Sequence, residues 1–324
     1  VMSLLRNTTA DNNSAFGYSS LKENTTGTYN TAVGSYALDA NTTGQSNTAI
    51  GQGSLTVATT ANHNTGVGHA ALHLNTSGQQ NTAVGKDALR DNTTASNNAS
   101  LGYRSLTNNT TGDQNTAVGA DAMYTNTAGE YNVAMGYMAL YTNNASNNTA
   151  VGYQTLLSNT TGSQNNAIGV SALYNNTTGS QNNAVGNLAL NANTASYNNA
   201  FGQQALQDNT TGVHNCAFGH DSLRENTTAS YNTAVGSQSL SVVTTSSANA
   251  AFGYQALKSN TTGGNNTAMG HKAFEDLTTG THNCAFGHDC AKNATTGSNT
   301  TAMGVDCLTA LTTGSGNTAF GRLS

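Results

Sequence analysis

The chain has 324 residues, of which 8% are charged, and it contains no proline and no tryptophan. Globular domains carry about 25% charged residues and about 5% proline, and disordered segments are enriched in Pro, Glu and Lys, so this composition fits neither class. The 10 basic and 15 acidic residues provide no basic footprint for nucleic acid, and no apolar run approaches the roughly 18 residues of a membrane span.

Residues 1–12 come before the regular pattern that fills the rest of the chain, and we expect them to form an N-terminal lead-in or cap. Their apolar stretch is too short for a signal peptide. Residues 13–324 are predicted to form a single repeat domain, because one pattern recurs throughout them.

A glycine recurs at a nearly constant interval from Gly17 to Gly321, and this period organises the chain. Most intervals have the length of Gly17 to Gly34, and two of them, 136–152 and 186–202, are one residue shorter. The short intervals lose a residue within a Thr-Thr-Gly segment, where we predict a turn because loops tolerate deletions best. We call each interval a coil. A column is the set of residues at one place in successive coils, named after its member near Gly34.

Five columns have a constant chemical character. The residue two before the glycine is small (the Ala32 column), and the residue just before it is large and apolar (the Val33 column). Leu dominates four residues after the glycine (the Leu38 column), and Asn dominates the Asn30 and Asn41 columns. All seven phenylalanines fall in the Val33 and Leu38 columns and all thirteen tyrosines in variable ones, so we expect Phe inside and Tyr outside.

The Asn41 column also accepts Leu277, Val243 and Ala58, which indicates that it is buried. Stacked at the strand spacing of about 4.8 Å, identical Asn amides form hydrogen-bonded ladders. Glycine at the two corners of the coil supplies positive φ or close backbone approach. The sequence therefore predicts an all-β fold, a parallel β-solenoid of about 18 coils with a 17-residue repeat and a length on the order of 90 Å.

An array of short helices is the structural alternative for a 17-residue unit. Asn, Thr and Gly are poor helix formers, and the five-residue spacing from Val33 to Leu38 matches no helical face. We therefore favour the solenoid.

The strand before each glycine predicts self-association. Adjacent strand residues point to opposite faces, so Ala32 and Val33 cannot both face one interior, yet neither column turns polar. We expect one column to fill the coil and the other to pack against sister chains in a homotrimer. A lone rod with a thin core is the alternative.

The segment from Asn30 to Gly44 reads Asn-Thr-Ala-Val-Gly-x-x-Ala-Leu-x-x-Asn-Thr-Thr-Gly, and it recurs with Ile168 from Asn165 to Gly179. This pattern resembles the repeats of phage tail fibres and bacterial surface fibres, and it is similar to the head repeats of trimeric autotransporter adhesins, whose coil is shorter. The resemblance implies a homotrimeric, left-handed, extracellular fibre that attaches to cell surfaces. Phage fibres often end in a self-cleaving chaperone domain, which implies that a C-terminal domain followed Ser324.

The chain shows little sign of catalysis. Its acidic residues occur singly, and no insertion is long enough to form a cleft for a general acid–base pair, so we expect no enzyme activity and no cofactor. His271 and His288 share a column in adjacent coils, but two ligands do not make a zinc site, so we expect polar surface residues and no metal. Cys290 and Cys307 are also column neighbours, and we expect small-residue replacements there because their parallel Cβ directions suit a disulfide poorly.

Exposed tyrosines are the candidate binding residues. Seven of the thirteen fall between Tyr103 and Tyr174. We expect Tyr137 to stack on Tyr153 and Tyr124 to stack on Tyr141, on a surface that binds a cell-surface glycan or a protein receptor. The simpler interpretation is that these tyrosines bind nothing and only cover the Asn-rich surface at the edges of the strands.

Threonine supplies an alternative function. Thr42 heads a column that is Thr in every coil except at Asn144. Ice-binding solenoids present rows of Thr, so ice binding is the alternative to a fibre role, although a single row is weaker than a pair of outward rows.

Overall fold

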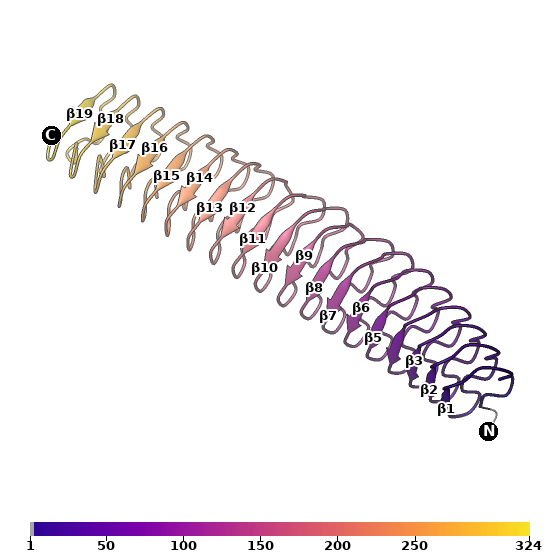
Figure 1. Cartoon of the computed structure of the whole chain (residues 1–324). Coiled ribbons are helices and arrows are strands. Elements are labelled where there is room, and N and C mark those ends of the chain that lie inside the picture. The colour runs from indigo at the N-terminus through magenta and orange to yellow at the C-terminus, as the bar shows by residue number, and fades with distance from the viewer. Residues whose placement is uncertain (1–2) are drawn as a thin grey trace. The chain divides into compact units, whose positions relative to one another are not determined.

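The computed structural model describes residues 3–324, so Val1 and Met2 of the expected lead-in lie outside the described residues. Within that range the chain forms 19 strands of three residues each and no helix, which confirms the predicted all-β parallel solenoid. The chain divides into two compact units, Val1–Gln164 and Asn165–Ser324. In each unit, consecutive strands lie side by side and each coil stacks on the next (Figure 1).

The first unit contains β1 (Ser14–Phe16), β2 (Thr31–Val33), β3 (Thr48–Ile50), β4 (Thr65–Val67), β5 (Thr82–Val84), β6 (Ala99–Leu101), β7 (Thr116–Val118), β8 (Val133–Met135) and β9 (Thr149–Val151). The second unit contains β10 (Asn166–Ile168), β11 (Asn183–Val185), β12 (Asn199–Phe201), β13 (Cys216–Phe218), β14 (Thr233–Val235), β15 (Ala250–Phe252), β16 (Thr267–Met269), β17 (Cys284–Phe286), β18 (Thr301–Met303) and β19 (Thr318–Phe320).

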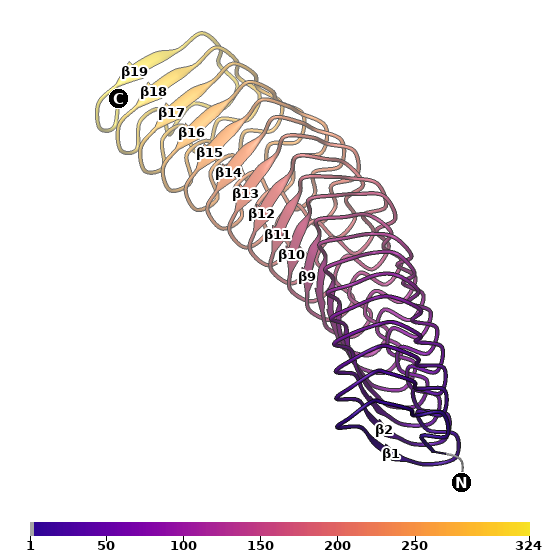
Figure 2. The ribbon, with the colours of Figure 1, turned by 45° about the vertical axis from the view of Figure 1, so that its right-hand side comes forward.

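Neighbouring strands pair in parallel in the register that the columns predict. Ala32 in β2 pairs with Ala49 in β3, for example. The strands of the second unit line one side of its coils (Figure 2). Elsewhere in the coil, backbone hydrogen bonds still join successive coils, as from Leu38 N to Ser54 O at 3.1 Å. Each coil is therefore bonded to the next around its perimeter, although only one side is regular strand.

Of the two apolar strand columns, the Ala32 column faces the interior of the coil and the Val33 column faces outward. Ala32 is completely buried, whereas Val33 is 37% exposed, because alternate strand residues face opposite sides. The Leu38 column is buried next to the Ala32 column and supplies the bulk of the core, including Phe274. The expectation that Phe lies inside is therefore wrong for the Val33 column, where residues such as Phe218 point outward from the chain.

Two asparagine ladders run through the coils. Asn47 is buried, and its amide nitrogen donates to Oδ1 of Asn30 at 3.1 Å and to the Ala61 carbonyl at 2.7 Å. In the second ladder, the Asn41 amide donates to Asn24 and also to the Gly44 carbonyl at 3.1 Å within its own coil. Buried amides are stable when they are hydrogen-bonded, so the ladders satisfy most polar atoms of the narrow core; Oδ1 of Asn41 has no partner among the described residues, because the next coil has Ala58 in this column.

The two corner glycines act in the two ways that the sequence predicts. Gly34 has a φ of +130°, and a Cβ atom there would lie 2.6 Å from the Gly51 carbonyl oxygen. Gly27 lacks a positive φ, but a Cβ atom would lie 2.6 Å from Oδ1 of Asn24. Close stacking of coils therefore excludes any side chain at the Gly34 corner, whereas the Gly27 corner also accepts a small one, as at Ala61 and Ala95.

Three non-glycine columns also adopt left-handed backbone, which the sequence did not indicate. Tyr36, Leu38 and Ser46 have φ values of 59°, 51° and 57°, and their column neighbours repeat them. Left-handed backbone costs roughly 1–2 kcal/mol for a residue with a Cβ atom. The hydrogen bonds and burial that each coil makes with its neighbours offset that cost.

Candidate binding surface

The four predicted tyrosines form two parallel stacks in the first unit. Tyr137 and Tyr153 follow the glycines that end β8 and β9, and their ring centroids are 5.5 Å apart at an interplanar angle of 19°. Tyr124 and Tyr141 lie five residues after their glycines, with centroids 5.4 Å apart at 10°. One residue per coil in each column explains both stacks.

Stacking reduces the area of flat ring surface that these tyrosines expose to a ligand. Tyr137 and Tyr153 are 42% and 49% exposed, whereas Tyr124 and Tyr141 are half-buried. Within each pair, one face of each ring is covered by its partner, so the surface presents ring edges, hydroxyl groups and the outer faces of the stacks. Flat faces are therefore scarcer than the number of tyrosines suggests.

Arg104 connects the two tyrosine columns, and sequence analysis missed it. Its guanidinium carbon lies 4.9 Å from the ring centroid of Tyr103 and 4.9 Å from that of Tyr124. Its Nε donates to Oδ1 of Asp121 at 2.8 Å, and that hydrogen bond raises the pKa of Arg104. A guanidinium held between two rings is a preorganised donor for hydroxyl or carboxylate groups. The signal was available, because Arg104 and Asp121 share a column one coil apart.

Ala120 leaves one tyrosine face open. The column one residue after the glycine reads Tyr103, Ala120, Tyr137 and Tyr153 in successive coils. Because Ala120 ends at Cβ, no ring covers the face of Tyr137 that is directed toward Ala120. This face lies beside the coil that contains Asp121, the partner of Arg104.

The remaining tyrosines of the predicted stretch are dispersed. Tyr131 is exposed but belongs to the column of Tyr29, twelve residues after the glycine. Tyr174 is half-buried and lies in the second unit. The tyrosine surface, as we use the term below, therefore consists of Tyr103, Tyr124, Tyr137, Tyr141 and Tyr153 together with Arg104.

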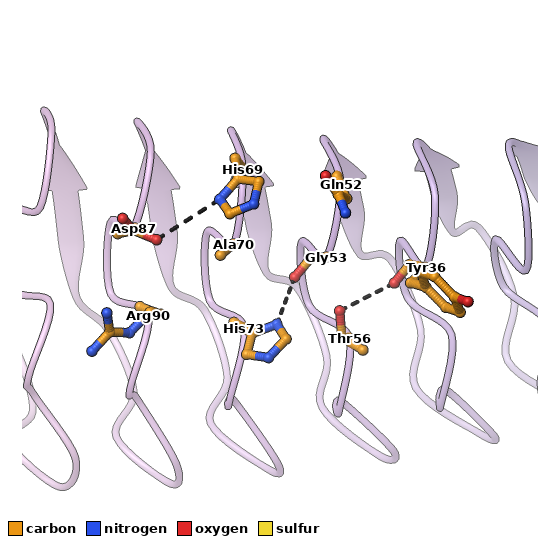
Figure 3. Close-up of a pocket in the computed structure, with 9 residues that line it drawn as sticks. All are labelled: Tyr36, Gln52, Gly53, Thr56, His69, Ala70, His73, Asp87 and Arg90. Carbon is orange, nitrogen blue, oxygen red and sulfur yellow. Dashed lines mark hydrogen bonds and ion pairs between the residues drawn. The ribbon is translucent and has the colours of Figure 1, made fainter.

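A hollow of about 370 Å³ opens on the first unit, between the coils that follow β2 and β5. Its lining residues are Tyr36, Gln52, Gly53, Thr56, His69, Ala70, His73, Asp87 and Arg90, as Figure 3 shows. The hollow exists because Gly53 and Ala70 are small in a column that elsewhere carries larger side chains.

The walls of this hollow are held in place by hydrogen bonds (Figure 3). His73 Nδ1 lies 3.0 Å from the Gly53 carbonyl oxygen, and the Thr56 hydroxyl donates to the Tyr36 carbonyl at 3.1 Å. His69 Nδ1 is 3.9 Å from Oδ1 of Asp87. The site can accept a small polar group, and sequence analysis did not identify it.

Threonine hydroxyls in the Thr42 column are engaged within the solenoid. The Thr42 hydroxyl donates to the Thr59 carbonyl at 3.1 Å, and the Thr25 hydroxyl donates to the Thr42 carbonyl at 3.0 Å. The exposed Thr row is the next column, which begins with Thr26 and Thr43. In the row proposed for ice binding, these threonine hydroxyls therefore donate their hydrogen bonds to backbone carbonyls of the next coil.

All four cysteines are free thiols. Cys290 and Cys307 are buried in the column of Ala37, as expected for small-residue replacements. Cys216 and Cys284 are half-buried on the outward face of the sheet. Burial raises the pKa of Cys290 to about 12, which keeps its thiol protonated and unreactive.

Comparisons with known proteins leave the family open. Neither the family models nor the curated proteins that were compared with the chain match it. Among residues 3–324, no helix has the length and apolar character needed to cross a membrane.

Proposed function

We propose that the chain is the non-catalytic shaft or head of an extracellular fibre, of the phage tail-fibre or bacterial surface-fibre type, that assembles from three copies and attaches to cell surfaces. The exposed Val33 column carries this proposal. The resemblance of the repeats to those of known fibres supports the number of copies, the left-handed coil and the extracellular location.

The Val33 column is an apolar strip in each unit. In the first unit it includes the exposed residues Ile50, Leu101 and Met135. In the second unit, Phe201 and Phe218 stack with centroids 4.6 Å apart. Soluble monomers rarely expose contiguous apolar patches larger than a few hundred Å², so a strip that recurs in every coil is best explained by burial against another chain.

A cyclic assembly suits a strip of this kind. Copies of one chain present the same strip, and packing them around a common axis along the stack of coils buries every strip equally. Neighbouring Thr31-column residues are mostly small and flank the strip on the same outward face of the sheet.

Native mass measurement tests the assembly. One chain weighs 33.0 kDa, so a trimer should appear at about 99 kDa. The double variant Ile50→Asp with Phe218→Asp should give the monomer mass, because it places charges in the buried strip. The control Tyr29→Asp changes an exposed residue of another column and should keep the trimer. A parent chain at the monomer mass would contradict the proposal, provided that circular dichroism shows the chain to be folded.

Attachment is assigned to the tyrosine surface. A saccharide ring stacks on the open face of Tyr137 above Ala120, and Arg104 donates hydrogen bonds to its hydroxyl or carboxylate groups. The supporting features are the uncovered face, the fixed guanidinium and the cluster of exposed aromatic edges.

Variants at Ala120 and Tyr137 test the attachment site on a panel of immobilised oligosaccharides. Tyr137→Ser with Tyr153→Ser should abolish binding and leave the assembly and melting temperature nearly unchanged. Ala120→Tyr should also abolish binding, although it adds an aromatic residue, because the new ring covers the face of Tyr137. The control Tyr231→Ser, in another column, should bind like the parent chain.

Unchanged binding by the Ala120→Tyr variant would reject stacking on Tyr137. If Ala70→Gln instead abolished binding, the ligand would belong in the hollow beside His69. Ice binding remains the alternative function, but the engagement of the Thr42 hydroxyl removes part of its support. Thermal hysteresis in a solution of the purified chain would support ice binding in place of the fibre function.

A further inference from the structure

Two histidines and an aspartate converge on the surface of the second unit. We propose that His271, His288 and Asp289 bind a divalent transition-metal ion, for which zinc is the best probe. His271 and His288 each follow the glycine after a strand, β16 and β17, and Asp289 is the next residue along the chain. The sequence placed the two imidazoles in one column, and we expected no metal there because two ligands are too few; the structure adds the carboxylate as a third.

The ligand atoms already lie close to a metal-binding geometry. One carboxylate oxygen of Asp289 is 3.4 Å from His271 Nδ1, and the other is 3.6 Å from His288 Nδ1. In a tetrahedral zinc site with bonds of about 2.0–2.2 Å, ligand atoms lie roughly 3.3–3.6 Å apart. Because the two distances end on different oxygens of Asp289, a zinc ion bound through one of them needs little change in one separation, and the carboxylate has to turn to bring that oxygen to the other imidazole.

The third separation, between the two imidazoles, has to shorten. The ligand atoms of all three residues lie within 4.8 Å of one another, and the two rings stack at 4.6 Å with an interplanar angle of 11°. Parallel rings direct their lone pairs side by side, so the rings must tilt toward each other to share an ion. Both side chains are partly exposed, at 42% and 55%, and among the described residues His288 has no other ring against it, so the tilt falls mainly on His288.

The surroundings favour a cation at this position. Lys272, the nearest cation along the chain, is paired with Glu275 at 3.2 Å, and Lys292 pairs with the same carboxylate at 3.6 Å. Tyr254 stacks on the far face of His271 at 5.4 Å and supports that ring. Two imidazoles and one carboxylate suit zinc, copper, nickel or iron, with water completing the coordination, whereas calcium and magnesium prefer oxygen ligands.

Two other places in the chain carry part of the same pattern. His220 lies 3.1 Å from Asp221, but the preceding coil has Gln203 where His271 stands in the proposed site. His69 lies 3.9 Å from Asp87, but Lys86 replaces the second imidazole. Of the described residues, only His271, His288 and Asp289 combine all three ligands at this spacing.

Isothermal titration of the whole chain with zinc chloride tests the proposal. The parent chain should bind one zinc ion per chain in the micromolar range and should not bind calcium. His271→Ala and Asp289→Asn should each weaken zinc binding by at least roughly tenfold. The matched control His220→Ala should bind zinc like the parent chain.

A gain-of-function variant keeps the test independent of any loss of folding. Gln203→His places a second imidazole beside His220 and Asp221 and should raise the stoichiometry to two zinc ions per chain. Absence of saturable zinc binding by the parent chain would overturn the proposal, as would equal binding by the parent and the His271→Ala variant. Neither result bears on the proposed fibre function, because the site does not include the Val33 column or the tyrosine surface.

Discussion

The side-chain amide of Asn41 donates a hydrogen bond of 2.8 Å to Oδ1 of Asn24, one coil earlier in the chain. Both side chains are fully buried, so this bond joins two coils through the interior of the solenoid. The same atom also donates to the Gly44 carbonyl within its own coil. Aspartate cannot replace asparagine here, because a carboxylate has no proton to donate to either partner.

Replacing one ladder asparagine by aspartate should destabilise the chain strongly. Asn109 donates to Asn92 and Gly112 and accepts from Asn126. Asn109→Asp removes both donated bonds and buries a charge, and we expect the free energy of unfolding to fall by roughly 3–5 kcal/mol. Chemical denaturation followed by circular dichroism measures the change. The control is Asn97→Asp on the exposed corner, where we expect a change within about 0.5 kcal/mol; equal effects would contradict the ladder's role.

A glycine at a corner of the coil and a glycine outside the corners should differ in their tolerance of alanine. A Cβ atom at Gly219 would lie 2.7 Å from the Gly236 carbonyl, at a φ of +135°, so Gly219→Ala should destabilise by more than about 1 kcal/mol. At Gly264, which has no positive φ, the nearest atom is the Ser247 carbonyl oxygen at 3.2 Å, and Gly264→Ala should destabilise less than Gly219→Ala. Thermal melts of the two variants compare them directly. A larger loss for Gly264→Ala would show that coil stacking does not determine the glycine period.

The loss of stability on replacing a leucine by alanine should depend on whether that leucine is buried in the solenoid. Leu106 is fully buried, and Leu106→Ala should reduce the free energy of unfolding by about 2–5 kcal/mol through lost burial and a cavity. Leu74 is exposed on the corner, and Leu74→Ala should change stability by no more than about 0.5 kcal/mol. Denaturant titrations provide both values. Similar losses at the two positions would place the core elsewhere.

Cys290 should resist alkylation in the folded chain. Its pKa is raised to about 12 from 9.0, first by burial and then by neighbouring Cys307, so at pH 8 almost no thiolate is present. Iodoacetamide should leave Cys290 unmodified until denaturant is added, as peptide mass spectrometry would show. Rapid labelling of the native chain would mean that this coil opens readily.

The same thiol has a consequence for stability at high pH. Above about pH 9 the unfolded thiol ionises while the folded thiol stays protonated, so its contribution to stability decreases as the pH rises toward 12. Between pH 9 and pH 11, Cys290→Ala should therefore lose less stability than the parent chain. The same pH dependence in both chains would exclude this thiol as the cause.

Sequence alone determined the period, the columns and the class of fold. The chain has a glycine at a nearly constant interval, two columns dominated by Asn, and a strand with two apolar columns. Stacked parallel coils explain all three features, because identical residues form hydrogen-bonded ladders and apolar contacts with one another when they lie one coil apart. The tyrosine stacks follow from the same rule, since Tyr137 and Tyr153 share a column.

Only the tertiary structure decided which way the strand faces. Ala32 and Val33 are both apolar, and alternation requires them to point in opposite directions without saying which points inward. The Leu38 column fills the narrow interior and leaves room only for a small residue such as Ala32, so Val33 is turned outward. Convergence of Asp289 on two histidines likewise depends on side-chain directions across coils. Those directions follow from left-handed backbone at non-glycine residues, including Asp289 and Leu38; a residue such as leucine disfavours this backbone locally, and hydrogen bonds between coils stabilise it.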